Sequence, residues 1–66
     1  MTITVNGESR SVADGLDITG LVAELGLTPD GIAVAVDHTV VPRGRWQGRT
    51  LDDGAQVEIV TAMQGG

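Results

Sequence analysis

The sequence predicts an α+β domain in which one short helix packs on one face of a mixed sheet. Three observations carry this prediction. Polar and apolar residues alternate near both ends of the chain, a β-branched apolar stretch lies in the middle, and a single segment between them repeats its apolar residues with helical spacing. One helix within a run of strands is typical of a sheet that buries one face beneath it.

The N-terminal segment predicts a β-hairpin. Residues 2–5 alternate polar and apolar side chains, Asn6-Gly7 follows, and residues 8–12 read as the returning strand. Asn-Gly between two strands is typical of a type I′ turn, because both central residues of that turn need a positive φ.

A short helix is predicted over residues 18–25. Its apolar side chains recur on one face, at Ile18, Leu21, Val22 and Leu25. Asp17 is suited to cap the N-terminus with its carboxylate, and Gly26 is suited to end the helix in the left-handed conformation. Gly20 costs the helix about 1 kcal/mol relative to Ala, so we expect packing to hold this segment.

Three further strands are predicted over residues 32–36, 39–41 and 57–61. The polar stretch 43–50 reads as a loop, and Pro42 before it ends a strand because proline cannot donate to a ladder. We expect the core to contain Ile3, Val5, Val12, Ile18, Leu21, Val22, Leu25, Ile32, Val34, Val36, Leu51, Val57 and Ile59.

Composition excludes several kinds of chemistry. The 66 residues fit one small domain, and the lack of cysteine excludes a disulfide framework, a thiolate nucleophile and a cysteine-ligated metal site. All four basic residues are arginines, so a P-loop lysine and a Schiff-base lysine are also excluded. The net charge of -5 favours a basic protein partner over nucleic acid. No apolar run approaches the length of a membrane span, and we expect a cytoplasmic protein that is monomeric when free.

Several side chains are weaker candidates for function. His38 is expected on a loop surface, and Asp52-Asp53 is expected to form a turn, not a metal site. Trp46 is expected to plug the core in part, with its indole N–H near water. Around it lie three of the four arginines, which we interpret as a partner-docking or merely solvated cluster: Arg43, Arg45 and Arg49.

The C-terminal segment is the most informative. Residues 62–66 have no periodicity, so we expect a flexible tail after a folded domain of residues 1–61. Gly65 and Gly66 lack a Cβ and can enter a narrow channel, and five residues reach at most about 16–18 Å. A carboxylate at Gly66 is ionised and unreactive at neutral pH, so acyl transfer needs activation by a partner that binds ATP.

The strand parity also predicts an apolar patch opposite the core, since Ala33, Ala35, Val60 and Ala62 alternate with the inward residues. Exposed apolar patches mark interaction surfaces. The residues to which we assign partner binding are Ala33, Ala35, Arg43, Val60, Ala62, Met63 and Gln64.

Three segments together resemble the ThiS family, the sulfur carriers of the thiamine pathway. They are residues 3–8, residues 36–43 with their Val40-Val41-Pro42-Arg43, and residues 53–62 leading into Gly65-Gly66. The resemblance implies a ubiquitin-like β-grasp fold with four or five strands, one helix, and the first and last strands parallel in the middle of the sheet. It also implies a carrier protein that is not an enzyme.

The resemblance further implies partners and a reaction. An E1-like adenylyltransferase would use Mg-ATP to adenylate Gly66, and a cysteine desulfurase or rhodanese-type protein would supply sulfur for a thiocarboxylate. Thiazole synthase would then accept the sulfur. Gly65 and Gly66 correspond to the reactive tail, whereas the chain itself is expected to bind no cofactor or metal.

The sequence departs from the family pattern at Gln64, where a small residue is common, and at Gly20, where a better helix former is common. The first departure bears on partner fit and the second on stability. Other interpretations stay open: the small subunit of molybdopterin synthase, a carrier for cysteine or methionine synthesis, a ubiquitin-like modifier, or an interaction domain with an incidental Gly-Gly.

Overall fold

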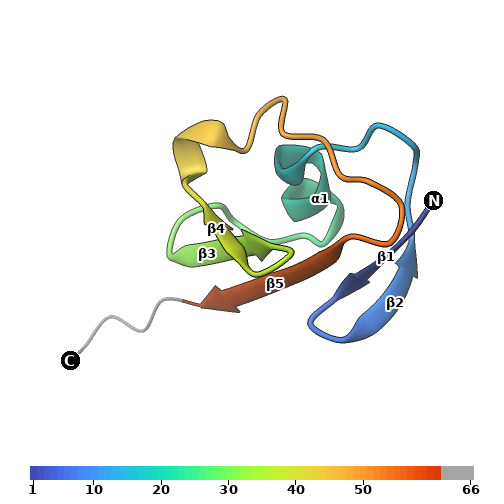
Figure 1. The fold of residues 1–66 in the computed structure, drawn as a ribbon. Coiled ribbons are helices and arrows are strands. Elements are labelled where there is room, and N and C mark those ends of the chain that lie inside the picture. Colours follow the sequence, from blue (N-terminus) through green and yellow to red (C-terminus); the bar gives the residue numbers. More distant parts are fainter. Residues whose placement is uncertain (62–66) are drawn as a thin grey trace.

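The computed structural model describes residues 1–61. In chain order the elements are β1 (Thr2–Val5), β2 (Glu8–Ser11), α1 (Ile18–Glu24), β3 (Ile32–Val36), β4 (Thr39–Val41), the 3₁₀ helix η1 (Arg43–Arg45) and β5 (Gln56–Thr61). The strands form one sheet in the order β2-β1-β5-β3-β4, and α1 packs against one face of it (Figure 1). The predicted α+β architecture is therefore confirmed.

The two ends of the folded region meet in the sheet interior. β1 and β5 are parallel, with Val5 beside Val57, whereas every other pair in the sheet is antiparallel. The first and last strands are thus neighbours, as the resemblance implied. A parallel pair needs a long crossover connection, and α1, β3 and β4 lie within it.

The turns follow the residues that predicted them. Asn6 and Gly7 have φ values of 51° and 82°, which match a type I′ turn between β1 and β2. Gly26 has a φ of 73° and follows α1, where it donates to Ala23 O at 3.0 Å while Leu27 donates to Val22 O at 3.1 Å. These two bonds form a Schellman motif, which satisfies carbonyls at the end of the helix.

Element boundaries differ slightly from those predicted. β2 and α1 each end one residue earlier, and β5 begins one residue earlier. The stretch 43–50, predicted as a loop, contains η1 at its start. Arg45 donates its N–H to Pro42 O at 2.8 Å, so proline, which ends β4, also supplies the acceptor that starts this turn.

The core contains three side chains that the strand and helix patterns missed. Val41, Trp46 and Ala55 are buried, together with nine of the predicted residues: Ile3, Val12, Ile18, Leu21, Val22, Val34, Val36, Leu51 and Val57. The other four predicted residues, Val5, Leu25, Ile32 and Ile59, are only partly buried and pack against the edge of this core.

The prediction for Trp46 was wrong in one respect. The side chain is only 3% exposed, and its indole Nε1–H donates to Val41 O at 2.8 Å instead of facing water. This bond joins the segment after η1 to the edge strand β4. Trp46 is therefore a full member of the core that ties the loop 43–50 to the sheet.

Gly20 in α1 is explained by close packing. A Cβ at this position would lie 2.7 Å from Leu16 Cδ1 and 3.1 Å from Asp17 Oδ1. Any larger residue would force the Leu16 side chain to move, which opposes the gain in helix propensity. The glycine thus gives the capping segment room to lie against the helix.

Asp17 caps α1 and also holds the loop 43–50. Its carboxylate accepts from Gly20 N–H at 2.7 Å and from Gly48 N–H at 3.0 Å. The bond from Gly48, followed by that from Gly20, lowers the pKa of Asp17 below 3.8. The predicted N-cap is confirmed, and the second bond is a tertiary contact that the sequence pattern does not contain.

The lowered pKa predicts acid sensitivity. Because the folded state favours the ionised form, Asp17 stabilises the fold above its unfolded pKa of 3.8, and this contribution disappears as pH falls through the lower folded value. We expect Asp17→Asn to be less stable than wild type at pH 6 and to lose less stability between pH 5 and 2.5. Urea denaturation across this pH range measures the difference, and parallel curves for the two proteins would contradict the prediction.

Candidate functional site

The candidate site begins where β5 ends. Thr61 is the last described residue, so the predicted tail lies outside the described region. It includes Gly65 and Gly66, which are predicted to be reactive, and the predicted partner-binding residues Ala62, Met63 and Gln64. The structure does describe the end of β5, after which the tail begins, and the surfaces around it.

The end of β5 is held firmly. Thr61 pairs with Ile32 of β3 on one side. On the other side, beyond the last residue of β1, the Asn6 side chain exchanges two bonds with the backbone of Ile59: Ile59 N–H donates to Asn6 Oδ1 at 2.8 Å, and Asn6 Nδ2 donates to Ile59 O at 3.1 Å. The turn residue therefore extends the strand pairing, and the tail starts from a fixed point.

The sheet face opposite α1 carries an apolar surface beside this point. Ala33 lies opposite Val60, and Ala35 lies opposite Val40. Val60 is 58% exposed and Val40 is 67% exposed, while the two alanines are half-buried. We call Ala33, Ala35, Val40 and Val60 the outer patch. The alternation along the predicted strands had placed Ala33, Ala35 and Val60 on one face. Val40 was missed because the sequence did not indicate which strand pairs with residues 39–41.

A charged rim borders the outer patch at the turn between β3 and β4. His38 is exposed, and its Nδ1 lies 3.7 Å from Glu58 Oε1. Asp37 and His38 both have positive φ values, 49° and 70°. The Asp37 carboxylate accepts from Gln56 N–H at 3.0 Å, and Asp37 N–H donates to Gln56 O at 2.8 Å, so this turn is anchored on β5.

Arg43, a predicted partner-binding residue, lies beside the sheet in η1. Its guanidinium forms an exposed ion pair with Asp30, in the turn that leads into β3. Since β3 starts opposite Thr61, this pair stands near the end of β5. Arg43 is accessible there but does not belong to the outer patch.

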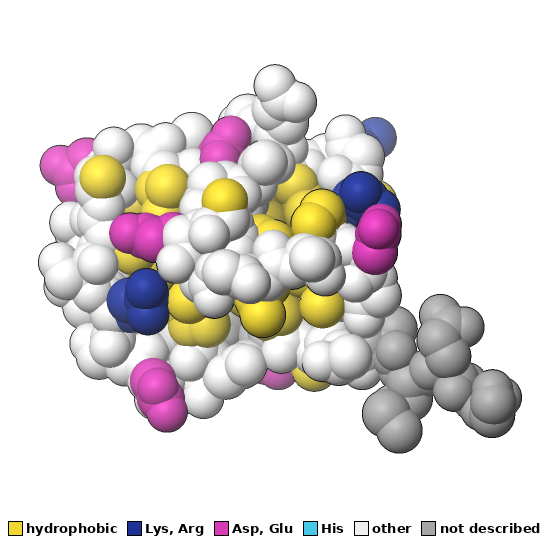
Figure 2. All heavy atoms as spheres, turned by 180° about the vertical axis from the view of Figure 1, so that it is seen from behind, with side chains coloured by type: hydrophobic (Ala, Val, Ile, Leu, Met, Phe, Trp, Pro, Cys, Tyr) yellow, Lys and Arg dark blue, Asp and Glu magenta, His cyan; other side chains and the backbone are white. Residues whose placement is uncertain are grey.

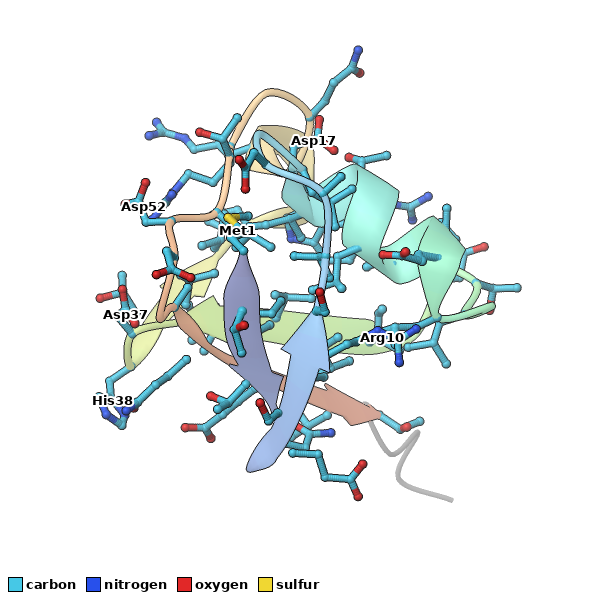
Figure 3. All side chains as sticks on the ribbon, turned by 90° about the vertical axis from the view of Figure 1, so that its right-hand side faces the viewer. Met1, Arg10, Asp17, Asp37, His38 and Asp52 are labelled. Carbon is cyan, nitrogen blue, oxygen red and sulfur yellow. The ribbon has the colours of Figure 1, made fainter. Side chains whose placement is uncertain are left out.

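A hollow lies on the helix side of the sheet, and sequence reasoning did not find it. We call this cavity of about 400 Å³ the inner groove; it is lined by Val5, Asn6, Glu8, Ser9, Arg10, Leu25, Leu27, Ile32, Ile59 and Thr61. In Figure 3, Arg10 extends from β2 toward the side on which α1 lies, whereas Asp37 and His38 lie at the opposite side of the molecule. Four predicted core residues that the structure leaves only partly buried line this groove: Val5, Leu25, Ile32 and Ile59.

Within residues 1–61 the structure shows neither a cluster of metal-ligating side chains nor a helix that could cross a membrane. This part of the chain contains no group of three or more His, Cys, Asp or Glu side chains that could hold a metal ion. Asp52 and Asp53 form the predicted turn, in which Asp53 Oδ1 accepts from Thr2 N–H at 2.8 Å. None of the helices found in these residues has the length and apolar character that a membrane crossing requires.

Comparison with known proteins points to one family. The model of the ThiS family matches residues 3–66. Over its full length the chain is 29% identical to the sulfur carrier protein ThiS of Escherichia coli, all of which it covers. A crystal structure of a thiamine biosynthesis protein (ThiS) from Geobacter metallireducens superposes with a TM-score of 0.87, at 32% identity and with 100% of both chains covered.

Two longer proteins contain a similar region. Over all 66 residues the chain is 35% identical to a thiazole synthase of Magnetococcus marinus and 30% identical to one of Paramagnetospirillum magneticum. It spans 20% of the length of each of these relatives. In both, a region like this chain is part of the same polypeptide as the remaining 80% or so of the protein.

Proposed function

Because the chain belongs to the ThiS family of sulfur carrier proteins in thiamine biosynthesis, we propose that Gly66 carries the sulfur as a C-terminal thiocarboxylate. The observation that carries this proposal is the family match through residue 66, which includes the Gly65-Gly66 pair. The chain has no cysteine, so the sulfur must be held by a group other than a side-chain thiol. A carboxylate at Gly66 meets that requirement.

The proposed reaction has two steps before delivery. An E1-like adenylyltransferase uses Mg-ATP to convert the Gly66 carboxylate into an acyl adenylate, with release of pyrophosphate. In the second step the persulfide sulfur of a cysteine desulfurase or a rhodanese-type donor attacks the acyl carbon and displaces AMP. A thiol, acting as the reductant, then cleaves the S–S bond of the resulting acyl disulfide, which releases the thiocarboxylate and leaves a disulfide between that thiol and the donor. Activation is needed because a carboxylate is a poor acyl donor at neutral pH.

Thiazole synthase is the proposed acceptor. Two proteins with that name contain a region similar to the whole of this chain, and domains joined in one polypeptide in some species often interact as separate chains in others. We propose that the carrier acts in the cytoplasm as a monomer and meets these partners in turn.

Intact-protein mass spectrometry tests the proposal. The chain is incubated with ATP, the adenylyltransferase and a sulfur source, and replacement of one carboxylate oxygen by sulfur adds about 16 Da. Fragmentation separates this change from oxidation of Met1 or Met63, which adds the same mass. A shift localised to Gly66 is expected, and a chain that stays unmodified while an authentic carrier is converted would refute the proposal.

The outer patch is the proposed surface for the adenylyltransferase. We expect Val60→Asp to weaken that complex at least about tenfold, because an unpaired charge would enter an apolar interface. Val60 is exposed, so the substitution leaves the core intact. Isothermal titration calorimetry with the adenylyltransferase measures the affinity of each variant. Ser11→Asp on β2 is the matched control, because it introduces the same charge at an exposed strand position outside the patch. Equal affinities for the two variants would exclude the outer patch.

A further inference from the structure

The inner groove has no role in the activation step proposed above. We propose that it docks an extended segment of the sulfur-accepting partner, one that carries aliphatic side chains and a carboxylate. This inference rests on the proposed function, because the acceptor must take the tail that starts at Thr61. It assigns the two faces of the sheet to two partners: the outer patch to the activating enzyme and the inner groove to thiazole synthase.

The groove opens at the point where the tail begins. Thr61 lines it, and the three residues Ile59, Val60 and Thr61 alternate between the faces of β5. Ile59 and Thr61 therefore border the groove while Val60 belongs to the outer patch. Residues 62–66 reach at most about 16–18 Å, so any enzyme that holds Gly66 in its active site must lie against the surface around Thr61.

The floor and wall of the groove are aliphatic. Val5, Ile32 and Ile59 form the floor from three adjacent strands, and Leu25 and Leu27 form the wall after α1. Leu27 is 41% exposed, although the Schellman motif holds its backbone in place. On the side shown in Figure 2, hydrophobic side chains reach the surface between polar and charged groups. A preformed hollow with an aliphatic floor and wall favours aliphatic side chains of a partner.

The neighbouring edge of the sheet favours an extended segment. Within residues 1–61, β2 is an edge strand, and β1 is its one strand partner. Val12 N–H donates to Met1 O at 2.8 Å, so by strand alternation Arg10 and Glu8 also direct their backbone groups toward β1. Ser9 therefore presents its N–H and C=O at the open edge, beside the groove that it lines. A partner strand can pair there and place alternate side chains over the groove.

The charged residues of the groove indicate which charged side chain the partner segment carries. Arg10 and Glu8 are the charged residues of the groove lining, and both are exposed. Arg10 extends to the helix side (Figure 3). Its guanidinium can donate two hydrogen bonds there to a carboxylate of the partner. Because Glu8 lies nearer the hairpin turn, the acidic residue of the segment lies toward Arg10 and away from that turn.

The test separates activation from delivery. Carrier thiocarboxylate is prepared chemically, by cleaving a C-terminal intein thioester with sulfide, so that the adenylyltransferase is not needed. Thiazole formation by thiazole synthase is then measured against carrier concentration. We expect Leu27→Asp to raise the KM for the carrier at least about tenfold and Arg10→Glu about three- to tenfold. Both variants should still be adenylated within about twofold of the wild-type rate.

Val40→Asp in the outer patch is the matched control, since it also introduces a carboxylate at an exposed aliphatic position. It should show the reverse pattern, with slower adenylation and an unchanged KM for delivery. Arg10→Lys should keep most of the delivery activity, and circular dichroism checks that each variant is folded. Unchanged delivery by Leu27→Asp, or equal losses in both steps, would overturn the groove assignment. If the wild-type thiocarboxylate itself gave no thiazole, the proposed function would fail as well.

Discussion

A chain without Gly66 is expected to accept no sulfur while it stays fully folded. The proposed chemistry takes place at the Gly66 carboxylate, and a terminus at Gly65 sets the carboxylate back by about 3.3–3.6 Å in the partner's active site. Misplacement of a reacting group by as little as about 1 Å can cost a hundredfold in rate. Thiocarboxylate formation should therefore fall to background in the mass spectrometric assay.

Stability should not change, because the described core is made by residues that end at β5. Every buried side chain in residues 1–61 lies between Ile3 and Val57. The variant that lacks Gly66 should unfold at the same urea concentration as wild type. A chain extended by two residues after Gly66 is a second test, since it keeps both glycines but places the carboxylate elsewhere. Sulfur transfer to either variant at the wild-type rate would show that the Gly66 carboxylate is not the reactive group.

The second large effect is expected from Trp46. Truncation of a buried tryptophan to alanine costs about 3–5 kcal/mol, and a domain of this length has roughly 3–10 kcal/mol of stability in total. Trp46→Ala should thus remove at least about a third of the free energy of unfolding, and it should lower the urea midpoint strongly. Trp46→Phe keeps most of the apolar contact but leaves Val41 O without its donor, which should cost about 1–3 kcal/mol.

Urea denaturation followed by far-UV circular dichroism measures both variants, because removal of Trp46 also removes the single tryptophan fluorophore. Gln47→Ala, at the exposed neighbouring position, is the matched control and should change stability by less than about 0.5 kcal/mol. A wild-type midpoint for Trp46→Ala would mean that the loop 43–50 is not tied to the core as the structure indicates.

The groove and the outer patch both lie beside the end of β5, so each proposed partner can bind close to the start of the tail. In the proposed function the same short tail enters two active sites, and both proposed surfaces border the last residues of β5. A partner bound at one face therefore has the tail within reach while the other face stays accessible. The alternation of side chains along β5 is what places Ile59 and Val60 on opposite faces.

The sequence determined the elements and their turns by local physics. The positive φ values at Asn6 and Gly7 and the cap at Asp17 follow from the conformations that these residues favour within a few positions of themselves. The core pattern was also local, because strand and helix periodicity fixes which side chains share a face. The resemblance to a known family, which rested on three short segments and the Gly-Gly end, identified the family correctly.

Only the tertiary structure decided how distant segments meet. No local pattern indicates that Trp46 donates to Val41 O, that Asp17 accepts from Gly48, or that Val40 lies opposite Ala35. The inner groove is likewise a result of how distant segments pack together. Its floor consists of residues whose periodicity predicts burial. However, α1 ends at Glu24 and is too short to cover the start of β3 and the end of β5, so Ile32 and Ile59 stay partly open to solvent. Periodicity states which way a side chain points, whereas the length and position of the element above it decide whether it is buried.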